Sequence, residues 1–420
     1  MSASATPAAP GTGTAAPAAA AHGPAGPAPM LPLGFTAAAA GAAIKKPGRD
    51  DMGLVRCPAG ATLAAVYTTN RICAAPIQLS RRHLAESRGH CGALLVNSGC
   101  ANAATGERGM ANAIELAEAV AKACDIATVA VQENSTGVIG VQLPIERMLP
   151  QVAPMAARAA HGTIEVFARA IMTTDTYPKW AARTVEHAGR RCSVVGCVKG
   201  AGMIHPNMAT MIGTILTDAA LTPAELDGHL RAAVERSFHR ISIDGDTSTN
   251  DSIFAMASGA ADQAGAGFPA DALRKAFTEV ARDLALLVVR DGEGYERGIH
   301  VRVTGAPTDA DALTVAKTIA SSLLVRCAVT GGDPNWGRIL AAAGRAGVRI
   351  DIEDLTLTVG GVKLFAAGAP ADTPLAEREA AFRAPMVDVV LDLGQGTGTD
   401  EFISCGLTKA YVELNADYTT

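Results

Sequence analysis

Residues 199–218 read KGAGMIHPNMATMIGTILTD, and this stretch places a hydroxyl nucleophile, Thr210, inside an apolar segment punctuated by glycines. A threonine hydroxyl is a weak nucleophile until a base lies beside it, and an N-terminal threonine can supply that base with its own α-amine. Such an amine has a pKa of about 8, so it titrates close to neutral pH. Ala209 precedes Thr210 and is small, so its carbonyl is one that Thr210 could attack. The stretch therefore allows self-cleavage into two chains that share one active site.

The same stretch also has a purely structural interpretation. In that case residues 208–216 form a core strand, and Thr210 is one of its β-forming residues. Gly200 and Gly202 allow the backbone to turn sharply or to approach a ligand closely. Pro206 would interrupt any continuous strand ladder just before the threonine. The residue types alone leave both interpretations open.

The bulk properties indicate an enzyme-sized chain with small partners. It has 420 residues, enough for two domains or one large one, and it carries a net charge of −5 with 4% aromatic residues. A nucleic-acid surface normally shows clustered basic residues with stacking aromatics, so we expect small neutral or zwitterionic partners instead. The nine cysteines are odd in number and form no CxxC pair, which favours a reducing cytoplasm without a disulfide framework. We expect neither a metal nor a cofactor.

The N-terminus differs in composition from the rest of the chain. Residues 1–31 are almost entirely Ala, Pro, Gly, Ser and Thr, and we expect them to be disordered. The segment lacks the positive residues of a secretory signal or a mitochondrial presequence. No later apolar stretch reaches 18 residues without a charge, so we expect no membrane span.

From about Pro32 onward, strand and helix patterns follow one another without a long linker. Alternating or short apolar runs predict strands at 93–97, 193–199, 208–216 and 386–393, and alternation continues over 401–415. Helical periodicity predicts helices at 111–124, 222–238, 269–289 and 309–324, the second opening with a Thr222/Glu225 capping box. This mixture predicts an α/β protein of stacked sheets flanked by helices.

Two polar segments could contribute to an active site. ENSTGVIG at 133–140 follows a short strand at 129–131, and its Thr136 hydroxyl and Gly137 amide could stabilise a developing oxyanion. An ordinary turn is the alternative. AIMTTDTYPK at 170–179 clusters Thr173, Thr174 and Asp175, which suits either ligand contacts or a helix N-cap.

Other glycine-rich or acidic segments have simpler interpretations. IDGDTSTNDS at 243–252 resembles a calcium loop in its aspartates but lacks the sixth-position glycine and the final glutamate, so we favour a hydrogen-bonded structural loop. Turns at 290–296 and 330–338 are either solvated or able to bind carboxylates. LGQGTGTDE at 393–401 has the wrong spacing for a nucleotide loop, and its continuation does not begin a helix, so ATP or dinucleotide chemistry is not expected.

Eight motifs, taken together, resemble the ornithine acetyltransferase family of the cyclic arginine pathway, also described as bifunctional glutamate N-acetyltransferases. The resemblance covers residues 32–420. The motifs occur in family order: VNSGCANAATG (96–106), ENSTGVIG (133–140), MTTDT (172–176), KGAGMIHPNMATM (199–211), ISIDGDTSTND (241–251), RDGEGYE (290–296), GGDPNWGRIL (331–340) and NADYTT (415–420). One such motif would be weak, whereas eight in order are highly specific.

The resemblance implies a four-layer αββα sandwich that cleaves itself between Ala209 and Thr210. An α chain (32–209) and a β chain (210–420) would then form one catalytic unit, with two of each in a heterotetramer. Thr210 would carry an acetyl group from N2-acetylornithine to glutamate in a ping-pong reaction. Some family members also use acetyl-CoA as the acetyl donor, so acetyl-CoA is a possible substrate here.

The resemblance also implies roles for individual residues. Thr136 and Gly137 match the oxyanion hole. The substrate-contacting positions correspond to Thr173, Lys199, Thr210, Glu293, Asn415 and Thr420, with Thr174 as the alternative to Thr173.

The chain departs from the family pattern in two places. Tyr295-Glu296-Arg297 replaces an expected Ala-Thr-Lys, and Cys100 replaces a usual asparagine. Two other functions compete with acetyl transfer: an N-terminal-nucleophile amidohydrolase or aminopeptidase of the same broad fold, and a binding protein whose chain stays intact.

Overall fold

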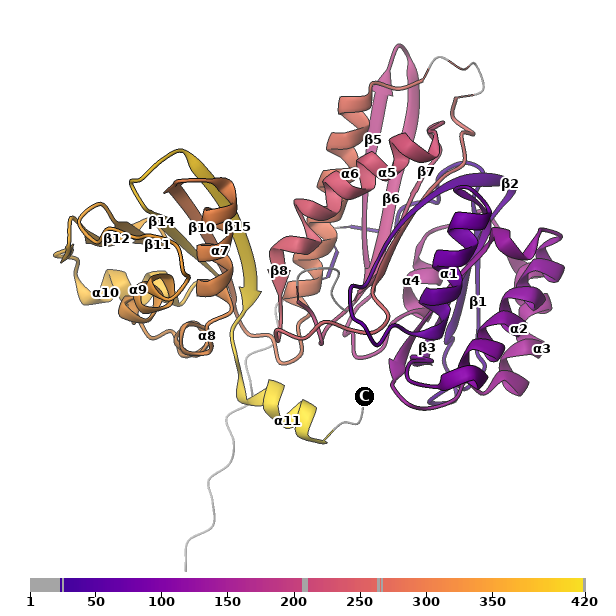
Figure 1. Cartoon of the computed structure of the whole chain (residues 1–420), viewed down its shortest axis with the longest axis horizontal. Coiled ribbons are helices and arrows are strands. Elements are labelled where there is room, and N and C mark those ends of the chain that lie inside the picture. Colours follow the sequence, from indigo (N-terminus) through magenta and orange to yellow (C-terminus); the bar gives the residue numbers. More distant parts are fainter. Residues whose placement is uncertain (1–22, 25, 206–210, 263–264, 266, 418–420) are drawn as a thin grey trace, which may run out of the picture.

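The computed structural model describes residues 23–24, 26–205, 211–262, 265 and 267–417, which form two sheets flanked by helices (Figure 1). The sequence-predicted α/β class is therefore confirmed. The predictions for Ala209, Thr210 and Thr420 lie outside the described residues.

The larger sheet has eight strands in the order β4-β3-β2-β9-β7-β6-β5, with β1 paired to β2. Neighbouring strands run antiparallel except for the parallel pairs β3–β4 and β7–β9. The strands are β1 (Thr36–Ala40), β2 (Met52–Tyr67), β3 (His90–Cys100), β4 (Val131–Val138), β5 (Lys179–His187), β6 (Arg190–Lys199), β7 (Ile212–Thr217) and β9 (Ser252–Ala257).

Six helices accompany this sheet. Among them, α1 packs against β4, α5 against β2, and α6 against β5 and β6. The helices are α1 (Ala75–Glu86), α2 (Gly106–Cys124), α3 (Ile145–Arg158), α4 (Glu165–Ala170), α5 (Pro223–Glu235) and α6 (Ala270–Arg290), with short 3-10 turns η1 (Thr128–Ala130) and η2 (Phe238–Arg240).

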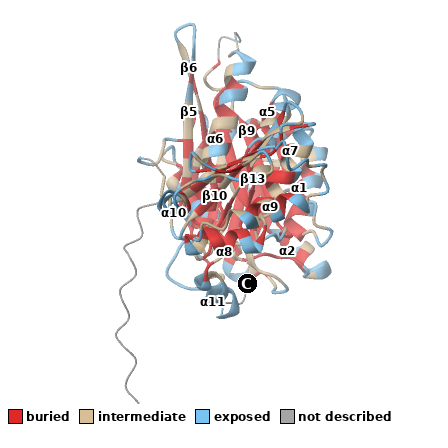
Figure 2. Cartoon of the chain, turned by 90° about the vertical axis from the view of Figure 1, so that its left-hand side faces the viewer, coloured by how far each residue is buried: buried red, intermediate tan, exposed pale blue. Residues whose placement is uncertain are grey.

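The smaller sheet has its own core and lies beside the larger sheet (Figure 1). Its seven strands run in the order β13-β12-β11-β14-β10-β15-β8. They are β8 (Ile241–Ser242), β10 (Gly298–Ala306), β11 (Thr356–Val359), β12 (Val362–Ala366), β13 (Ala369–Pro370), β14 (Met386–Asp392) and β15 (Gly398–Cys405). Its helices are α7 (Asp309–Ala320), α8 (Leu323–Gly331), α9 (Trp336–Gly344) and α10 (Leu375–Phe382), and the chain then forms α11 (Lys409–Asp417). Figure 2 shows α11 as an exposed helix below the buried core of the molecule, and the helix has no buried residue.

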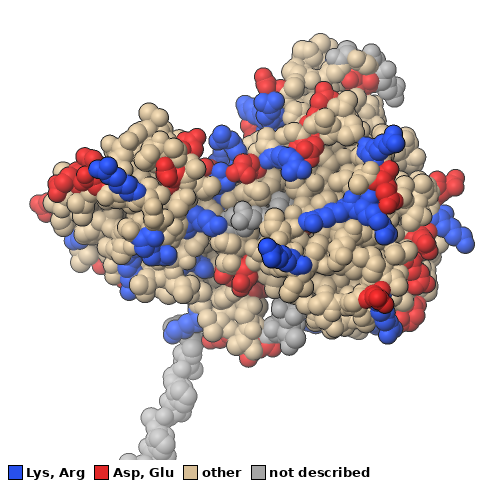
Figure 3. Space-filling model, viewed as in Figure 1, with Lys and Arg blue, Asp and Glu red and all other residues tan. Residues whose placement is uncertain are grey.

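The visible surface carries mixed charge. Figure 3 shows Lys and Arg interspersed with Asp and Glu over both parts of the molecule. Within the described part of the chain, no single helix is long and apolar enough to cross a membrane, and only the bent pair α7 and α8 meets that test, by length and composition alone.

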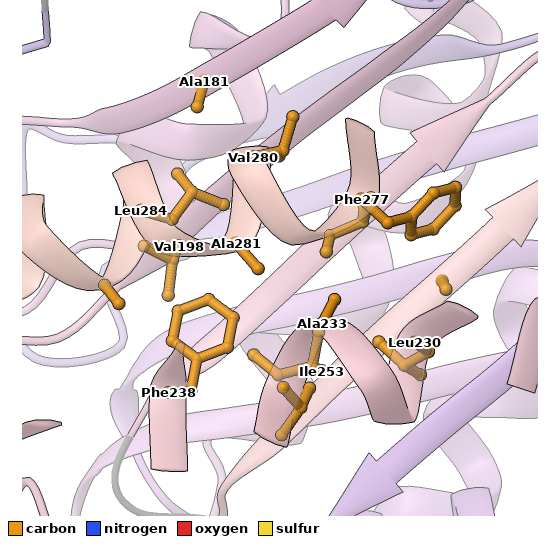
Figure 4. Packing of buried hydrophobic residues seen from close by; sticks show 14 of the residues in the cluster. Ala181, Val198, Leu230, Ala233, Phe238, Ile253, Phe277, Val280, Ala281 and Leu284 are labelled. Carbon is orange, nitrogen blue, oxygen red and sulfur yellow. The ribbon is translucent and has the colours of Figure 1, made fainter. Parts of the chain in front are cut away.

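The helices pack because their apolar faces match the sheet. In Figure 4, Val280, Ala281 and Leu284 of α6 lie against the sheet that contributes Val198. Gly196 of β6 permits this contact, since a Cβ there would lie 2.9 Å from both Val280 and Leu284 side-chain carbons. The predicted capping box is confirmed, because Thr222 accepts the Glu225 amide while the Glu225 side chain accepts the Thr222 amide.

Several predicted boundaries need correction. The strand predicted at 208–216 begins at Ile212 in the described residues, and the helix predicted at 309–324 ends at Ala320 before α8 begins. The strand alternation over 401–415 is wrong after Cys405, because the chain turns at Gly406, where a Cβ would lie 2.3 Å from the Thr330 hydroxyl. Packing also begins before Pro32, since Leu31 is buried and its amide donates to the Gly162 carbonyl over 2.8 Å.

Candidate active site

One pocket brings together the sequence-predicted site residues that the structure describes. The pocket is lined by six of them: Thr136, Gly137, Thr173, Lys199, Glu293 and Asn415. The remaining lining residues are Lys45, Lys46, Arg49, Asp51, Ser98, Gly99, Ala101, Ile139, Met172, Thr174, Gly202, Met203, Ser248, Thr249 and Asn250.

Thr136 and Lys199 are two buried polar residues that line the pocket. Thr136 lies within β4 and not in the predicted loop, because residues 133–137 continue the strand and pair with β3. Lys199 ends β6, and its Nζ donates to Thr136 Oγ1 over 3.3 Å. Both residues are buried. Burial lowers the pKa of Lys199, since desolvation disfavours its charged form. A carboxylate entering the pocket would offset that desolvation.

Gly137 occupies a position that only glycine can fill. Its φ is +132°, and a Cβ would lie 2.3 Å from the backbone carbonyl carbon of Gly99. Any larger side chain would push β3 and β4 apart. The close approach leaves the backbone of Gly137 at the pocket wall beside Thr136.

Glu293 and Asn415 meet across the pocket from two distant parts of the chain. Asn415 of α11 donates through Nδ2 to Glu293 Oε2 over 2.9 Å. The Glu293 amide donates to the Ala201 carbonyl over 2.8 Å. Gly202 leaves room for the Glu293 carboxylate, because a Cβ at Gly202 would lie 2.5 Å from it. The pocket therefore presents a buried carboxylate as well as a buried ammonium.

The 173–176 segment is held by a buried ion-pair network. Asp175 accepts Lys179 Nζ over 2.6 Å, the Gly200 amide over 2.7 Å and the Thr173 amide over 2.9 Å. Although burial alone would raise the pKa of Asp175, the charges of Lys179 and Lys199 lower it below its ordinary value. The helix N-cap interpretation is wrong, because strand β5 follows. Thr173 and Thr174 both line the pocket.

Arg49 is one pocket residue that sequence reasoning missed. Its Nη2 donates to the Met172 carbonyl over 2.5 Å and lies 3.4 Å from Ser98 Oγ, so it ties the 172–174 segment to β3. The available signal was the charge cluster KKPGRDD at 45–51.

The structural interpretation of 243–252 is confirmed, and this loop also reaches the pocket. Asn250 donates through Nδ2 to the Ala101 and Ser135 carbonyls over 2.6 and 2.8 Å. Ser248, Thr249 and Asn250 line the pocket wall. In the part of the chain that the structure describes, no group of three or more His, Cys, Asp or Glu residues could hold a metal ion.

None of the residues in the two departures from the family pattern lines the pocket, although Cys100 lies between Gly99 and Ala101, which do. Tyr295 donates to the Pro385 carbonyl over 3.3 Å, Arg297 donates to the Thr330 carbonyl over 2.6 Å, and Glu296 is exposed. Cys100 is buried in the core cluster of α2 and α3. The 330–338 turn contributes no residue to the pocket and instead connects α8 to α9.

The sequence pattern of the ArgJ family matches residues 36–420. The arginine biosynthesis bifunctional protein ArgJ of Nitratidesulfovibrio vulgaris is 44% identical over 391 residues, covering 92% of this chain and 98% of that protein. Its counterpart from Rhodopirellula baltica is 41% identical over 399 residues, covering 93% and 97%. A crystal structure of ArgJ from Bacillus halodurans is 37% identical, with a TM-score of 0.45 and coverage of 49% of this chain and 97% of that one. On the near-complete match in sequence, the chain belongs to the ArgJ family.

Proposed function

We propose that this protein is an acyltransferase of arginine biosynthesis that moves an acetyl group from N2-acetylornithine to glutamate. The observation that carries the proposal is that one pocket is lined by polar residues from segments far apart in sequence. These residues are Thr136, Gly137, Lys199, Glu293 and Asn415. Membership of the ArgJ family supports the same reaction class.

The pocket suits an amino-acid substrate. The Lys199 ammonium can meet an α-carboxylate, and the Glu293 carboxylate can meet an ammonium group. Thr136 and the Gly137 amide can donate to the oxyanion that forms when the acetyl carbonyl is attacked. Both substrates carry a carboxylate, so one site can serve them in turn.

Self-cleavage would prepare the nucleophile. Thr210 Oγ attacks the Ala209 carbonyl carbon, the C–N bond to Thr210 breaks, and the hydroxyl proton passes to the departing amine. Water then hydrolyses the Ala209–Thr210 ester, releasing the Ala209 carboxylate and restoring the Thr210 hydroxyl. The new α-amine serves as the base in later turnovers.

Transfer would then proceed in two halves. Thr210 Oγ attacks the acetyl carbon of acetylornithine, the amide C–N bond breaks, and ornithine leaves with the proton. The glutamate amine attacks the acetyl ester, the C–O bond breaks, and the Thr210 hydroxyl recovers its proton. No cofactor enters this scheme, and we expect the enzyme to work in the cytoplasm as a tetramer of two α and two β chains.

Denaturing mass spectrometry tests the first step. We expect two fragments, residues 1–209 and 210–420, and a single chain in the Thr210→Ala variant. A full-length species in the unaltered protein would overturn the mechanism. Trimming of the N-terminal tail would alter only the first mass.

The acetyl acceptor tests the second step. We expect acetylornithine to be consumed only when glutamate is present, with ornithine and N-acetylglutamate formed in equal amounts. Equal consumption with and without glutamate would establish the amidohydrolase alternative. A parallel assay of acetyl-CoA with glutamate tests the second activity that the relatives' description as bifunctional suggests.

A further inference from the structure

Acetylornithine and glutamate share an α-carboxylate but carry opposite charges at the end of their side chains. The ornithine side chain ends in an ammonium group, and the glutamate side chain ends in a carboxylate. The acetyl group leaves the α-nitrogen of one and joins the α-nitrogen of the other, so both side chains extend from the same place. Glu293 lines the pocket and can bind the ammonium group, but it would repel the carboxylate. The glutamate side chain therefore needs a positively charged subsite of its own.

One loop brings positive charge to the pocket. Lys45, Lys46 and Arg49 all line the pocket, and all belong to residues 41–51, which join β1 to β2. These three residues are exposed, whereas Lys199, which also lines the pocket, is buried. The exposed part of the lining thus carries the charge that a second carboxylate requires.

The buried residue Asp51 fixes the base of this loop. One of its carboxylate oxygens accepts the Ala42 amide over 2.7 Å, and the other accepts the Ile44 amide over 2.6 Å. Its backbone carbonyl accepts the Ser98 amide of β3 over 2.9 Å. Because the Asp51 carboxylate is bonded to the loop backbone, it holds the loop in shape before any ligand enters. A preformed loop loses less conformational entropy when it binds a ligand.

The loop also packs beside the proposed oxyanion hole. A Cβ at Gly99 would lie 3.0 Å from the Lys45 Cβ, and a Cβ at Gly137 would lie 2.3 Å from the Gly99 carbonyl carbon. Gly99 thus contacts both the loop and Gly137. The positively charged loop and the proposed oxyanion donors line one pocket, as a substrate held at both ends requires.

Lys46 and Arg49 keep their charges available for a ligand. Arg49 Nη2 donates to the Met172 carbonyl over 2.5 Å, and Nε donates to the Asp50 carbonyl over 3.4 Å. Both of these acceptors are uncharged backbone groups. Among the described residues, neither Lys46 nor Arg49 forms an ion pair with a carboxylate.

We propose that Lys46 and Arg49 form the subsite that binds the side-chain carboxylate of glutamate and so select glutamate as the acetyl acceptor. The inference rests on the proposed acetyl transfer. Ammonium and guanidinium groups bind a carboxylate through charge-assisted hydrogen bonds. The same charges disfavour the ammonium end of ornithine, which Glu293 can bind instead. The two ends of the pocket would therefore help glutamate to replace ornithine between the two halves of the reaction.

Lys46→Gln tests the subsite by comparing two acceptors. Glutamine matches glutamate in size, but its side chain is uncharged, so the ratio of the two kcat/KM values isolates the carboxylate. With saturating acetylornithine, we expect the unaltered protein to prefer glutamate by at least about 10-fold. We expect Lys46→Gln to lower this preference about fivefold, as the loss of one exposed ion pair would. Lys46→Arg keeps the charge and should keep the preference.

Two outcomes of this comparison would overturn the subsite. They are an unaltered preference in Lys46→Gln and the absence of any preference in the unaltered protein. Lys409→Gln is the matched control, because it removes the same charge from an exposed position on α11 that does not line the pocket. We expect its preference to stay within about twofold of the unaltered value. An equal loss of preference in Lys409→Gln would show a general effect of charge and would also overturn the subsite.

The donor substrate separates this role from a general loss of binding. The KM for acetylornithine should not rise in Lys46→Gln, because the donor side chain carries the same charge as the lysine. A KM for acetylornithine that rises in step with the KM for glutamate would overturn the subsite.

A further measurement distinguishes the carboxylate from phosphate groups. If Lys46→Gln raises the KM for acetyl-CoA and leaves the preference for glutamate unchanged, Lys46 binds the phosphates of acetyl-CoA and the proposed carboxylate subsite is wrong. If the unaltered protein transfers the acetyl group to neither amino acid, the proposed function fails instead.

Discussion

Lys179 and Lys199 are both buried and both lie near Asp175, but their partners give them different roles. Lys179 Nζ is neutralised by Asp175 and Asp291. Lys199 Nζ has a hydroxyl, Thr136 Oγ1, as its hydrogen-bond partner among the described residues, and it lines the pocket. A buried ammonium without a carboxylate directly bonded to it is suited to bind one from a ligand. Lys179 instead stabilises the pocket wall.

Thr136→Ala tests the oxyanion role. We expect kcat/KM for acetyl transfer to fall by an amount equivalent to about 2–4 kcal/mol, because one donor to the developing charge is lost. Part of the self-cleavage should remain. Thr136→Ser retains the hydroxyl and serves as the control in the same steady-state assay. An unchanged transfer rate in Thr136→Ala would refute the assignment.

Asp175→Asn tests the buried ion pair through the pH dependence of stability. The lowered pKa of Asp175 means that its carboxylate contributes stability above its ordinary pKa of 3.8, and that this stability is lost as pH falls below that value. We expect the variant to lose about 1.5–3 kcal/mol at pH 7, because the charged hydrogen bond to Lys179 is lost while Lys179 keeps its pair with Asp291. Denaturant unfolding at several pH values should show the deficit shrinking below about pH 4. A deficit that does not depend on pH would contradict the ion-pair explanation.

At the scale of elements, sequence patterns succeed where an apolar face decides the structure. The capped helix α5 and the strand β14 follow their predicted periodicity because their buried residues recur at helix and strand spacing. The polar strand β4 was missed because Glu133 and Asn134 are buried through tertiary contacts and not through apolar character.

The C-terminal helix α11 was also mispredicted, for a related reason. Its Val412 and Leu414 remain 57% and 37% exposed, so the alternation of apolar and polar residues in this segment does not mark a buried strand face. Pocket residues between 45 and 51 were missed because a cluster of charges carries no periodic signal and is usually a solvated surface segment. The ordered motifs identified the other site residues only as members of a family pattern, and the tertiary fold is what places them together.

Asn415→Ala tests how α11 contributes to the pocket. The helix has no buried residue, whereas Asn415 donates to Glu293 over 2.9 Å. We expect KM for acetylornithine to rise about 10-fold, because Glu293 loses the amide that orients its carboxylate in the pocket. The melting temperature should change little, because α11 buries no residue. Glu413→Ala, exposed on the same helix, should alter neither value. A lower melting temperature with unchanged KM would show that the contact is structural.

At the scale of the whole molecule, cleavage at Ala209–Thr210 would divide a sheet whose strands are interleaved. The order β4-β3-β2-β9-β7-β6-β5 places β9 and β7, from the second fragment, between β2 and β6, from the first. Strand β2 pairs with β9 from Thr62 to Tyr67, and β6 pairs with β7 from Val194 to Lys199. Separation of the fragments would break both ladders and expose a shared core, which leaves many backbone groups without partners.

We therefore expect the two fragments to remain one particle after cleavage. Native mass spectrometry of the unaltered protein should show both fragments together, with separation only in denaturant. Thr210→Ala should show the same native assembly and a single chain under denaturing conditions, because the strand pairing does not depend on the peptide bond. Fragments that appear separately in native mass spectrometry would contradict the interleaved sheet. Neither fragment alone contains both partners of the β2–β9 pair or of the β6–β7 pair.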